Sequence, residues 1–469
     1  MYGPLSKELE GKIKIVHLAY GPDERDSLLR YGVTEPVITF KDEIKRIWNE
    51  IDIPSTTEIE AVDSIIIEQT KGAFNLNGAI QSDRGFTLLS YSESLKLTVV
   101  YYRFWKKFLV DHHIDYVMHE PTSLMMNFIS ALLCLKQGAQ YIYQIMVKGE
   151  YGDLSYLLMT GFDFTCPQLE RNYSFYVHRA KIFDRGRCED FIRNFRGELT
   201  VYLGNQIVPD SSWTRLLGGT LHAHLRRLFQ ARRFDRCTDN IDHWDLLQDL
   251  SGKKLINLLR YAVEVTFCEF EPDVPYYYYP LHLEPEAVVL YQGQGLYRNQ
   301  VKLIENIAAQ LPPNTFLYVK DHPHAFGYRS ADDFKAFQRI PNIRLIRHDV
   351  PGKQIINHAI GVITINGTAG FEALLMGKQV YTLSKTFYGV CSRVNYIHHV
   401  RDLREAIYSK RDSLYQDDDE LYQFVAAYLD SLSEGMVDYF AGRALQYGIN
   451  LDANTKKIAQ SILKYVAVS

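Results

Sequence analysis

A histidine followed by proline stands where a predicted buried strand ends, in FLYVKDHPH at 316–324. This strand places Lys320 near its end and His322 just beyond it. Proline fixes φ and lacks an N–H, so Pro323 would give the imidazole of His322 a stiff turn. A histidine placed there can donate a hydrogen bond to a phosphate oxygen, as a neutral ring or as a cation. A surface histidine satisfied by the backbone is the alternative.

A second polar turn follows a predicted strand in INGTAGFEALLMG at 365–377. We expect Thr368 to be the N-cap of the next helix, with its hydroxyl, the adjacent free N–H groups and the helix dipole forming an anion site. The carboxylate in the first helical turn would reach a sugar or ribose hydroxyl. A capped helix without a ligand is the alternative. The candidate binding residues here are Asn366, Gly367, Thr368, Ala369, Gly370 and Glu372.

Two further polar turns are expected at the same edge of the sheet, in YQGQGLY and HLEPEA. The glycines of the first do not form a GxGxxG motif, so the signal is weak. Both turns can line the crevice at the carboxyl ends of the strands, where open α/β sheets bind ligands. A purely structural loop is the alternative. They add Gln292, Gly293, Gln294, His282 and Glu286 to the candidates, with Glu284 between the last two.

Carboxylates that could carry proton or nucleophile chemistry come from the first half of the chain. Glu120 ends the predicted strand IDYVMHE and precedes a helix that begins PTS. Such a carboxylate can act as a general base toward a hydroxyl, or as a nucleophile. Asp83 with Arg84 in QSDRGF, and Glu150 with Asp153 in KGEYGD, are the other candidates. Each of these can also be an ordinary surface residue.

The sequence contains no motif typical of a metal site or of a nucleoside triphosphate site. The acidic run DDDE at 417–420 is typical of a solvated helix start, and no P-loop, GxSxG or HExxH occurs. We therefore expect neither a metal nor a cofactor.

The elements that must position these turns alternate between strand and helix in two stretches. In the first, strands are expected at 12–20, 64–69, 114–120 and 139–147, and helices at 90–113 and 121–138. In the second, strands are expected at 276–282, 287–292, 315–321, 343–349, 361–366 and 379–384, and helices at 296–312, 332–340, 352–359 and 368–377. Such alternation is typical of parallel sheets wound with helices.

The predicted fold class is α/β, with two Rossmann-like doubly wound domains facing a cleft, an outline that resembles the GT-B architecture. The N-terminal domain is expected at 1–275, with a helical elaboration at about 150–270, and the C-terminal domain at 276–440. Helices at 441–469 are expected to pack back on the N-terminal domain.

Composition narrows the class of partner. The net charge of −4 gives no basic stripe for nucleic acid. The local cluster RRLFQARR at 226–233 is either a solvated helix face or a contact for an anionic acceptor or a membrane surface. With no signal-peptide core and no long apolar window, we expect a cytoplasmic protein, at most peripheral on the inner membrane. The six scattered cysteines predict reduced thiols.

The motifs of residues 276–395 together resemble a known family. The strand-end HP, NGTAGFEALLMGKQVYTLSKTFYG, the preceding YYPLHLEPEA and the Gln/Gly turn occur in the order found in bacterial capsule polysaccharide synthesis proteins. That group includes the Kdo transferases of capsule export and is distantly similar to bacterial sialyltransferases of GT-B form. Where sialyltransferase-like enzymes carry a serine-rich phosphate turn, this chain has Asn366-Gly367-Thr368.

The resemblance implies a metal-independent glycosyltransferase. Its donor would be a nucleotide sugar, with CMP-Kdo or another CMP-linked acidic sugar favoured, and its acceptor a glycan or a lipid-linked glycan of capsule assembly. His322 and Thr368 with its neighbouring amides would hold the donor phosphate. Two other readings of the scaffold stay open: a nucleotide-sugar epimerase or polyol-phosphate transferase, and a non-catalytic sugar-binding subunit.

Overall fold

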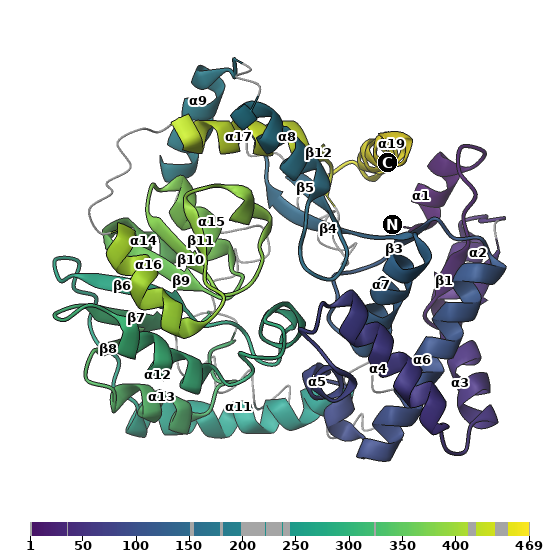
Figure 1. Cartoon of the computed structure of the whole chain (residues 1–469), viewed down its shortest axis with the longest axis horizontal. Helices are drawn as coiled ribbons and strands as arrows, with labels where there is room; N and C mark the ends of the chain where they lie inside the picture. The colour runs from purple at the N-terminus through teal and green to yellow at the C-terminus, as the bar shows by residue number, and fades with distance from the viewer. Residues whose placement is uncertain are drawn as a thin grey trace. The chain divides into compact units, whose positions relative to one another are not determined.

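The computed structural model shows an α/β protein whose chain divides into two compact units (Figure 1). It describes residues 2–34, 36–150, 154–178, 182–197, 244–322, 325–410, 419–436 and 449–468, and the single positions 221 and 237. Unit 1 comprises residues 1–76, 89–172 and 427–469, and unit 2 comprises 77–88 and 173–426. Residue 275, where the sequence suggested a boundary, lies inside unit 2.

Unit 1 combines a mixed sheet with long helices. Its four-stranded sheet has the order β12-β5-β4-β3, in which β3 and β4 are parallel and β5 is antiparallel to β4, while β1 and β2 form a separate parallel pair. The elements of this unit are α1 (Tyr2–Leu9), β1 (His17–Ala19), α2 (Pro22–Arg30), β2 (Val37–Thr39), α3 (Phe40–Glu50), α4 (Thr56–Gln69), α6 (Tyr91–Asp111), β3 (Tyr116–Met118), α7 (Met125–Gln137), β4 (Gln140–Lys148), β5 (Leu154–Thr160), β12 (Ser433–Glu434) and α19 (Leu451–Val468).

The chain termini of unit 1 pack together over its sheet. Leu5 of α1 and Ile458 of α19 are buried in one apolar cluster with Ile142 of β4 and Leu158 of β5. The C-terminal helix therefore covers a sheet whose strands β3, β4 and β5 come from residues 116–160 and whose strand β12 comes from residues 433–434. α8 (Pro167–His178) and α17 (Asp419–Ser431) each run from one unit into the other.

Unit 2 is a parallel six-stranded sheet with helices on both faces. Its order β11-β10-β9-β6-β7-β8 is, counted along the chain, 6-5-4-1-2-3, and every strand pair is parallel. This is the doubly wound Rossmann order. In Figure 1 the strands lie between α12 and α13 on one side and α14 and α15 on the other. The expected α/β class, with parallel sheets wound with helices, is confirmed.

Unit 2 also contains several short elements beside the sheet. Among the described residues its elements are α5 (Leu76–Ser82), η1 (Phe86–Leu88), α9 (Arg185–Gly197), α11 (Trp244–Glu264), β6 (Tyr276–Pro280), η3 (Val288–Gln292), α12 (Gln300–Gln310), β7 (Phe316–Lys320), α13 (Ala331–Gln338), β8 (Ile343–Ile346), α14 (Gly352–His358), β9 (Gly361–Thr364), α15 (Thr368–Leu375), β10 (Gln379–Thr382), η5 (Phe387–Val390), β11 (Val394–Tyr396), η6 (Val400–Asp402) and α16 (Leu403–Lys410).

The central strand β6 explains how four consecutive tyrosines fit inside a sheet. Tyr276 to Tyr279 are all buried, and the rings of Tyr276 and Tyr318 stack at 3.9 Å between centroids. Their hydroxyl groups reach partners at the sheet margins: Tyr276 donates to the carbonyl of Ile355 at 2.6 Å, and Tyr318 to that of Glu271 at 2.9 Å. A strand covered on both faces can carry such large side chains where their polar tips find acceptors, as those of Tyr276 and Tyr279 do.

Two predicted strands are wrong, and the strands β2, β5, β11 and β12 were not predicted. The isoleucine run at 64–69 is the end of α4, not a strand, and residues 288–292 form a π-helical turn instead of a strand. The strand β5 has no counterpart in the prediction, because the region after 150 shows no convincing alternation. Among the described residues, no helix is both long and apolar enough to cross a bilayer.

Candidate functional site

The point where the order of the unit 2 sheet reverses brings the predicted turns together. β6 pairs with β7 on one side and β9 on the other, and the chain leaves β6 toward β7 and β8 before it returns to β9. A crevice opens outside the carboxyl ends of the strands at such a switch point, because the connecting segments diverge there. The turns after β6, β7 and β9 carry the histidines, the carboxylates and the glycines singled out in the sequence.

His282 joins the ends of β6 and β9. Its Nε2 lies 3.2 Å from Oγ1 of Thr364 and 3.3 Å from the backbone N of Ile365. Because a backbone N–H donates, Nε2 accepts this bond and the ring proton belongs on Nδ1. Burial, with the nearby charges of His322 and Arg329, lowers the pKa of His282 to about 3. His282 is therefore a neutral side chain that holds the turn after β9, and not a cationic phosphate ligand.

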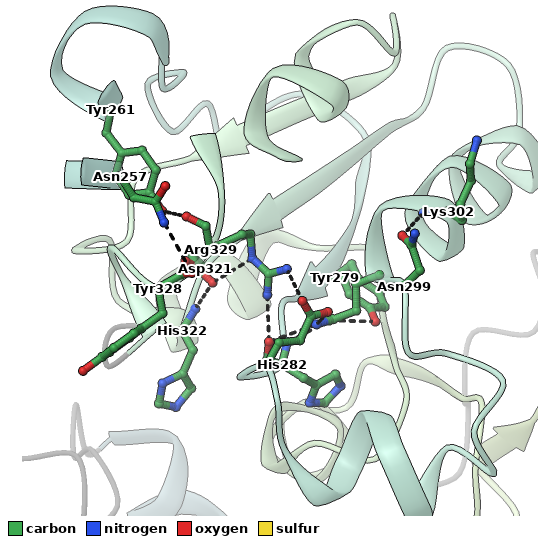
Figure 2. A network of polar contacts seen from close by, with 12 residues as sticks. Asn257, Tyr261, Tyr279, His282, Asn299, Lys302, Asp321, His322, Tyr328 and Arg329 are labelled. Carbon is green, nitrogen blue, oxygen red and sulfur yellow. Dashed lines mark hydrogen bonds and ion pairs between the residues drawn. The ribbon is translucent and has the colours of Figure 1, made fainter. Parts of the chain in front are cut away.

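A buried polar network fixes the loop that contains His282. Oε1 of Gln300 accepts from the backbone N of His282 at 2.9 Å, and Nε2 of Gln300 donates to the carbonyl of His282 at 3.0 Å. The carboxylate of Glu284 accepts from Nε2 of Gln300 at 2.5 Å and from Nη1 of Arg329 at 3.1 Å. Arg329 also donates to the carbonyl of His282 through Nη2 at 2.9 Å. Figure 2 shows these contacts converging on the loop after β6.

The strand end that carries His322 is anchored in the same network. Asp321 is buried, its Oδ1 accepts from the backbone N of His322 at 3.0 Å, and it lies 3.5 Å from Nε of Arg329. The side chain of His322 is half-buried, and Figure 2 shows its ring on the same side of the network as the ring of His282. The charge of His322 also acts on the pKa of His282, so the two rings are near neighbours. Pro323 lies outside the described residues.

Lys320 adds a buried positive charge at the end of β7. Its Nζ donates to the carbonyl of His348 at 3.1 Å, and only 6% of the residue is exposed. Burial lowers the pKa of Lys320 to about 8, while the carboxylates of Asp321, Asp349 and Glu372 act in the opposite direction. At neutral pH the ammonium group is still mostly protonated and favours an anion beside it.

The turn after β9 differs from the prediction in three details. The N-cap of α15 is Gly367 without a side-chain cap, and Thr368 is the first helical residue, with an exposed side chain. The N–H of Gly370 donates to the carbonyl of Gly367 at 3.0 Å, so it is not free for a ligand. Glu372 lies beyond the first helical turn, which contains no acidic residue. The N–H groups of Thr368 and Ala369 begin the helix, where an anion is favoured.

The side chain of Tyr388 also holds the turn after β9 in place. Its hydroxyl donates to the carbonyl of Gly367 at 2.7 Å and lies so close to Gly370 that a Cβ there would collide with it. Gly370 is therefore required for space. Gly367 is similarly confined, since a Cβ would lie 2.8 Å from Oγ1 of Thr364 and 3.1 Å from Cε1 of His282.

The Gln/Gly turn and the turn after β9 are also in contact. Oε1 of Gln292 accepts from Nδ2 of Asn366 at 3.1 Å. A Cβ on Gly293 would lie 3.1 Å from the carbonyl oxygen of Val288, and Gln294 has a φ of 55°. In the loop before this turn, burial raises the pKa of Glu286 to about 7, and Arg84 acts in the opposite direction.

The predicted catalytic carboxylates are separated between the units. Asp83 belongs to unit 2 and is buried, with Oδ1 accepting from the backbone N of Gly85 at 2.7 Å and Oδ2 from the hydroxyl of Tyr291 at 3.4 Å. Glu120 and Glu150 belong to unit 1. Asp153 lies outside the described residues. The catalytic roles of these residues stay predictions.

Three residues of the site escaped prediction: Arg329, Gln300 and Tyr388. Arg329 follows His322 by seven positions in a stretch without periodicity, so nothing in the sequence indicated that it is buried. Gln300 begins a helix, where an amide is unremarkable. Tyr388 is one of two aromatics in KTFYG, and the glycine-rich turn that it confines was the available signal. Among the described residues, no group of three or more His, Cys, Asp or Glu side chains is placed to hold a metal ion.

Comparisons with known proteins match the segment that carries this site. Residues 252–427 match the family model described as capsule polysaccharide biosynthesis protein. The capsule polysaccharide export protein KpsS of Escherichia coli is 28% identical over 102 residues, which are 20% of this chain and 25% of that protein. Protein FixF of Sinorhizobium fredii is 32% identical over 96 residues, which are 20% of this chain and 21% of that protein. The match thus spans a quarter or less of the length of these curated relatives.

One solved structure is similar to this chain at a low TM-score. The beta Kdo 2,7 transferase KpsC of Thermosulfurimonas dismutans aligns with a TM-score of 0.30 and 12% identity, over 69% of this chain and 79% of that one. The match of residues 252–427 includes the β6, β7 and β9 turns and thus most of the motifs on which the resemblance rested. That resemblance is confirmed: this segment of the chain matches the capsule polysaccharide biosynthesis family and is similar to a capsule polysaccharide export protein.

Proposed function

We propose that the chain is a glycosyltransferase of bacterial surface polysaccharide synthesis that binds a nucleotide sugar at the switch point of the unit 2 sheet. The observation that carries the proposal is the position of His282. In the segment that matches the capsule family, this histidine ties the ends of β6 and β9 together and holds two polar turns against one crevice. Rossmann-ordered sheets bind nucleotides at this place.

The donor phosphate would be held by groups from two strand ends. The imidazole of His322 and the hydroxyl of Thr368 are donors, and the N–H groups of Thr368 and Ala369 add the positive end of the α15 dipole. The ammonium of Lys320 supplies charge from the base of the crevice. A leaving group with a single phosphate needs no more than this to have its developing charge stabilised. CMP-Kdo or another CMP-linked acidic sugar is therefore the donor that we favour, and no metal is required.

Transfer needs a base for the acceptor. The acceptor hydroxyl attacks the anomeric carbon, the bond from that carbon to the phosphate oxygen breaks, and the hydroxyl proton passes to a carboxylate. Glu120 is our candidate for this base. The proposal thus implies a GT-B arrangement, in which the carboxylate comes from unit 1 and the phosphate site from unit 2. The acceptor would be a glycan or a lipid-linked glycan.

The test is to incubate purified protein with CMP-Kdo and other nucleotide sugars, with and without acceptor glycans, and to analyse the products by NMR. We expect transfer to acceptor, and a loss of at least 100-fold for His322→Ala, because removing one hydrogen-bond donor to the charge that develops on the phosphate costs about 3 kcal/mol. His358→Ala is the matched control, since His358 is exposed at the end of α14. Turnover without acceptor would instead indicate an epimerase, and a folded protein that binds no donor would refute the proposal.

A further inference from the structure

A small cavity with both polar and apolar walls lies in unit 2, beside the segment that carries His322. It has a volume of about 260 Å³ and lies between the loop after β6 and the chain from the β7 turn to the start of α13. The lining includes Glu284, Ala325, Tyr328, Arg329, Ser330 and Asp333. None of these residues was predicted to bind a ligand. The size suits one ring of a ligand and not a whole nucleotide.

The cavity is continuous in structure with the groups that would hold phosphate. The backbone N of Ala325 donates to the carbonyl of His322 at 2.8 Å, and the backbone N of Tyr328 donates to the carbonyl of Ala325 at 2.8 Å. Arg329, on the cavity wall, donates to the carbonyl of His282 at 2.9 Å. The cavity wall and the turn of His322 therefore belong to one hydrogen-bonded segment of the chain.

The wall of the cavity is fixed before any ligand arrives. Only 2% of the Arg329 side chain is exposed, and its guanidinium is held by Glu284 at 3.1 Å and by Asp321 at 3.5 Å. Asn257 and Tyr261 support the same loop, through the Nδ2 bond of Asn257 to the carbonyl of Gly327 at 3.1 Å and the hydroxyl bond of Tyr261 to the carbonyl of Arg329. Such pre-organisation lowers the entropic cost of binding.

The wall offers both acceptors and donors. Glu284 and Asp333 present carboxylates, and burial, together with the charge of Glu284, raises the pKa of Asp333, whereas Arg329 lowers it. A guanidinium has five N–H donors, and the described contacts of Arg329 use three of them. Two carboxylates beside one guanidinium disfavour a second anion and suit hydroxyl groups, which donate to the first and accept from the second.

We propose that this cavity binds a hydroxyl-bearing ring that is attached to the donor phosphate, either the ribose or the transferred sugar, and that Asp333 is a specificity-determining residue for its hydroxyl groups. The assignment rests on the proposed function, since it takes the phosphate at His322 as its starting point. Asp333 is bonded from its backbone N to the carbonyl of Ser330 at 3.2 Å, so its side chain is carried by the first turn of α13.

The neighbouring Asp332 provides a matched control for Asp333. It lies in the same helical turn, does not line the cavity, and has a side chain that is 65% exposed and paired with Arg260 at 2.7 Å. Asp333→Asn and Asp332→Asn make the same chemical change one position apart. Only the first alters the cavity.

The experiment is calorimetric titration of both variants and of wild-type protein with CMP and UDP, their dideoxyribose analogues and the corresponding nucleotide sugars. We expect Asp333→Asn to weaken binding about tenfold, as for one lost hydrogen bond to a charged group, and Asp332→Asn to leave it unchanged. If Asp333→Asn weakens binding of the nucleotide but not of its dideoxyribose analogue, the ring in the cavity is the ribose. If Asp333→Asn weakens binding of the nucleotide sugar alone, the ring in the cavity is the transferred sugar.

The remaining outcomes separate the two proposals. Equal affinities of the two variants for every probe, with binding abolished by His322→Ala, would overturn the cavity assignment alone. No binding of any nucleotide by folded wild-type protein would overturn both. Asp333→Glu, which keeps the charge and narrows the cavity, gives the same test should Asp333→Asn fail to fold.

Discussion

The carboxyl edges of the two sheets differ in how the ends of their strands are joined. In unit 2 the ends of β6, β7 and β9 are joined by Gln300, Arg329 and His282. In unit 1 the end of β3 has His119, whose Nδ1 is buried and has no hydrogen-bond partner among the described residues. The edge of unit 2 thus holds a buried ion-paired network, whereas the described bonds at the end of β3 run from single side chains to the backbone, such as that of the Tyr141 hydroxyl to the Glu120 carbonyl at 2.7 Å.

The difference follows from sheet topology. In an all-parallel sheet every strand ends at one edge, so loops from several strands meet and can bind one another. In unit 1, β5 runs antiparallel to both of its neighbours, β4 and β12, so the strands of this sheet do not all end at one edge. A cross-linked edge is rigid enough to hold a small anion in fixed geometry. Four predictions test how far the two edges differ, beginning with the largest effect.

Replacing Arg329 should cause the greatest loss of stability. Arg329→Met leaves the buried carboxylate of Asp321 and the side chain of Glu284 without their cation. Removing one partner of a buried ion pair lowers the unfolding free energy by about 3–5 kcal/mol. Urea denaturation of the variant and of wild-type protein measures this loss of stability. In unit 1, Lys136→Met removes the surface pair with Glu68, which lies at 2.7 Å with both side chains about half exposed, and should cost under about 1 kcal/mol. Equal costs would contradict the comparison.

Substituting Gly370 tests whether the turn after β9 is limited by space. Gly370→Ala places a Cβ against the hydroxyl of Tyr388 and 3.1 Å from Cγ2 of Thr364, and should cost about 1–3 kcal/mol, as overpacking does. Tyr388→Phe removes the offending oxygen, so the double variant should be less destabilised than the sum of the single ones.

The matched glycine of unit 1 is Gly138, which ends α7 with a φ of 76° and where an added Cβ would meet no atom within 4 Å. Gly138→Ala should cost about 1 kcal/mol through its backbone conformation. No second substitution nearby should relieve it. Additive costs for Gly370→Ala and Tyr388→Phe would show that space at the β9 turn is not limiting.

The two buried histidines should give separate pH signatures. Burial lowers the pKa of His119 to about 4, and that of His282 to about 3, from ordinary values near 6.5. The unfolded chain takes up protons below pH ~6.5 while the folded protein does not, so stability is present above that pH and is lost as the pH falls. His119→Gln and His282→Gln should each flatten this decline by up to about 1.4 kcal/mol per pH unit.

The two histidines differ in the pH below which each becomes protonated in the folded protein. Below pH 4 only His282 still resists protonation, so the two variants should diverge there. Denaturation midpoints from pH 7 to 3.5 check this. Coincident curves for His282→Gln and wild-type protein would mean that His282 is protonated in the folded state.

How much of this could be predicted from the sequence depends on the range of the interactions. The turns after β7 and β9 were found because strand periodicity and local Gly, Pro and Thr chemistry lie within a few residues. The isoleucine run at 64–69 misled because its residues favour strands, whereas Ser55 and Glu58 form a capping box that begins α4 well upstream. A capping signal nine residues away decided the conformation.

The cross-links of the site could not be predicted, because they join residues distant in the chain. Arg329 and Glu284 are 45 positions apart, and His282 and Ile365 are 83 apart. Such pairs appear only when the strand order is known, and the strand at 287–292 that the sequence suggested would have placed Gln292 incorrectly. The short apolar run there is a π-helical turn, which periodicity over five residues does not distinguish from a strand.

The smallest effect on stability should come from Thr368, and it separates a helix start built for stability from one left open. α6 of unit 1 begins with a capping box, in which the Oγ of Ser90 accepts from the backbone N of Glu93 and the Glu93 carboxylate accepts from the backbone N of Ser90 at 2.8 Å. α15 of unit 2 has no side-chain cap, and Thr368 is exposed at its first position. An uncapped N-terminus keeps its N–H groups available to an anion.

Thr368→Val should therefore change unfolding free energy by less than about 0.5 kcal/mol, since no described protein contact of its hydroxyl is lost, yet weaken nucleotide binding about tenfold. Ser90→Ala should do the reverse, costing about 1 kcal/mol of stability with unchanged nucleotide affinity. Denaturation and calorimetry on the same two variants give both quantities. A Thr368→Val protein that loses stability and retains affinity would show that the hydroxyl caps α15, and the N-terminus of this helix would then be closed in the way that α6 is closed.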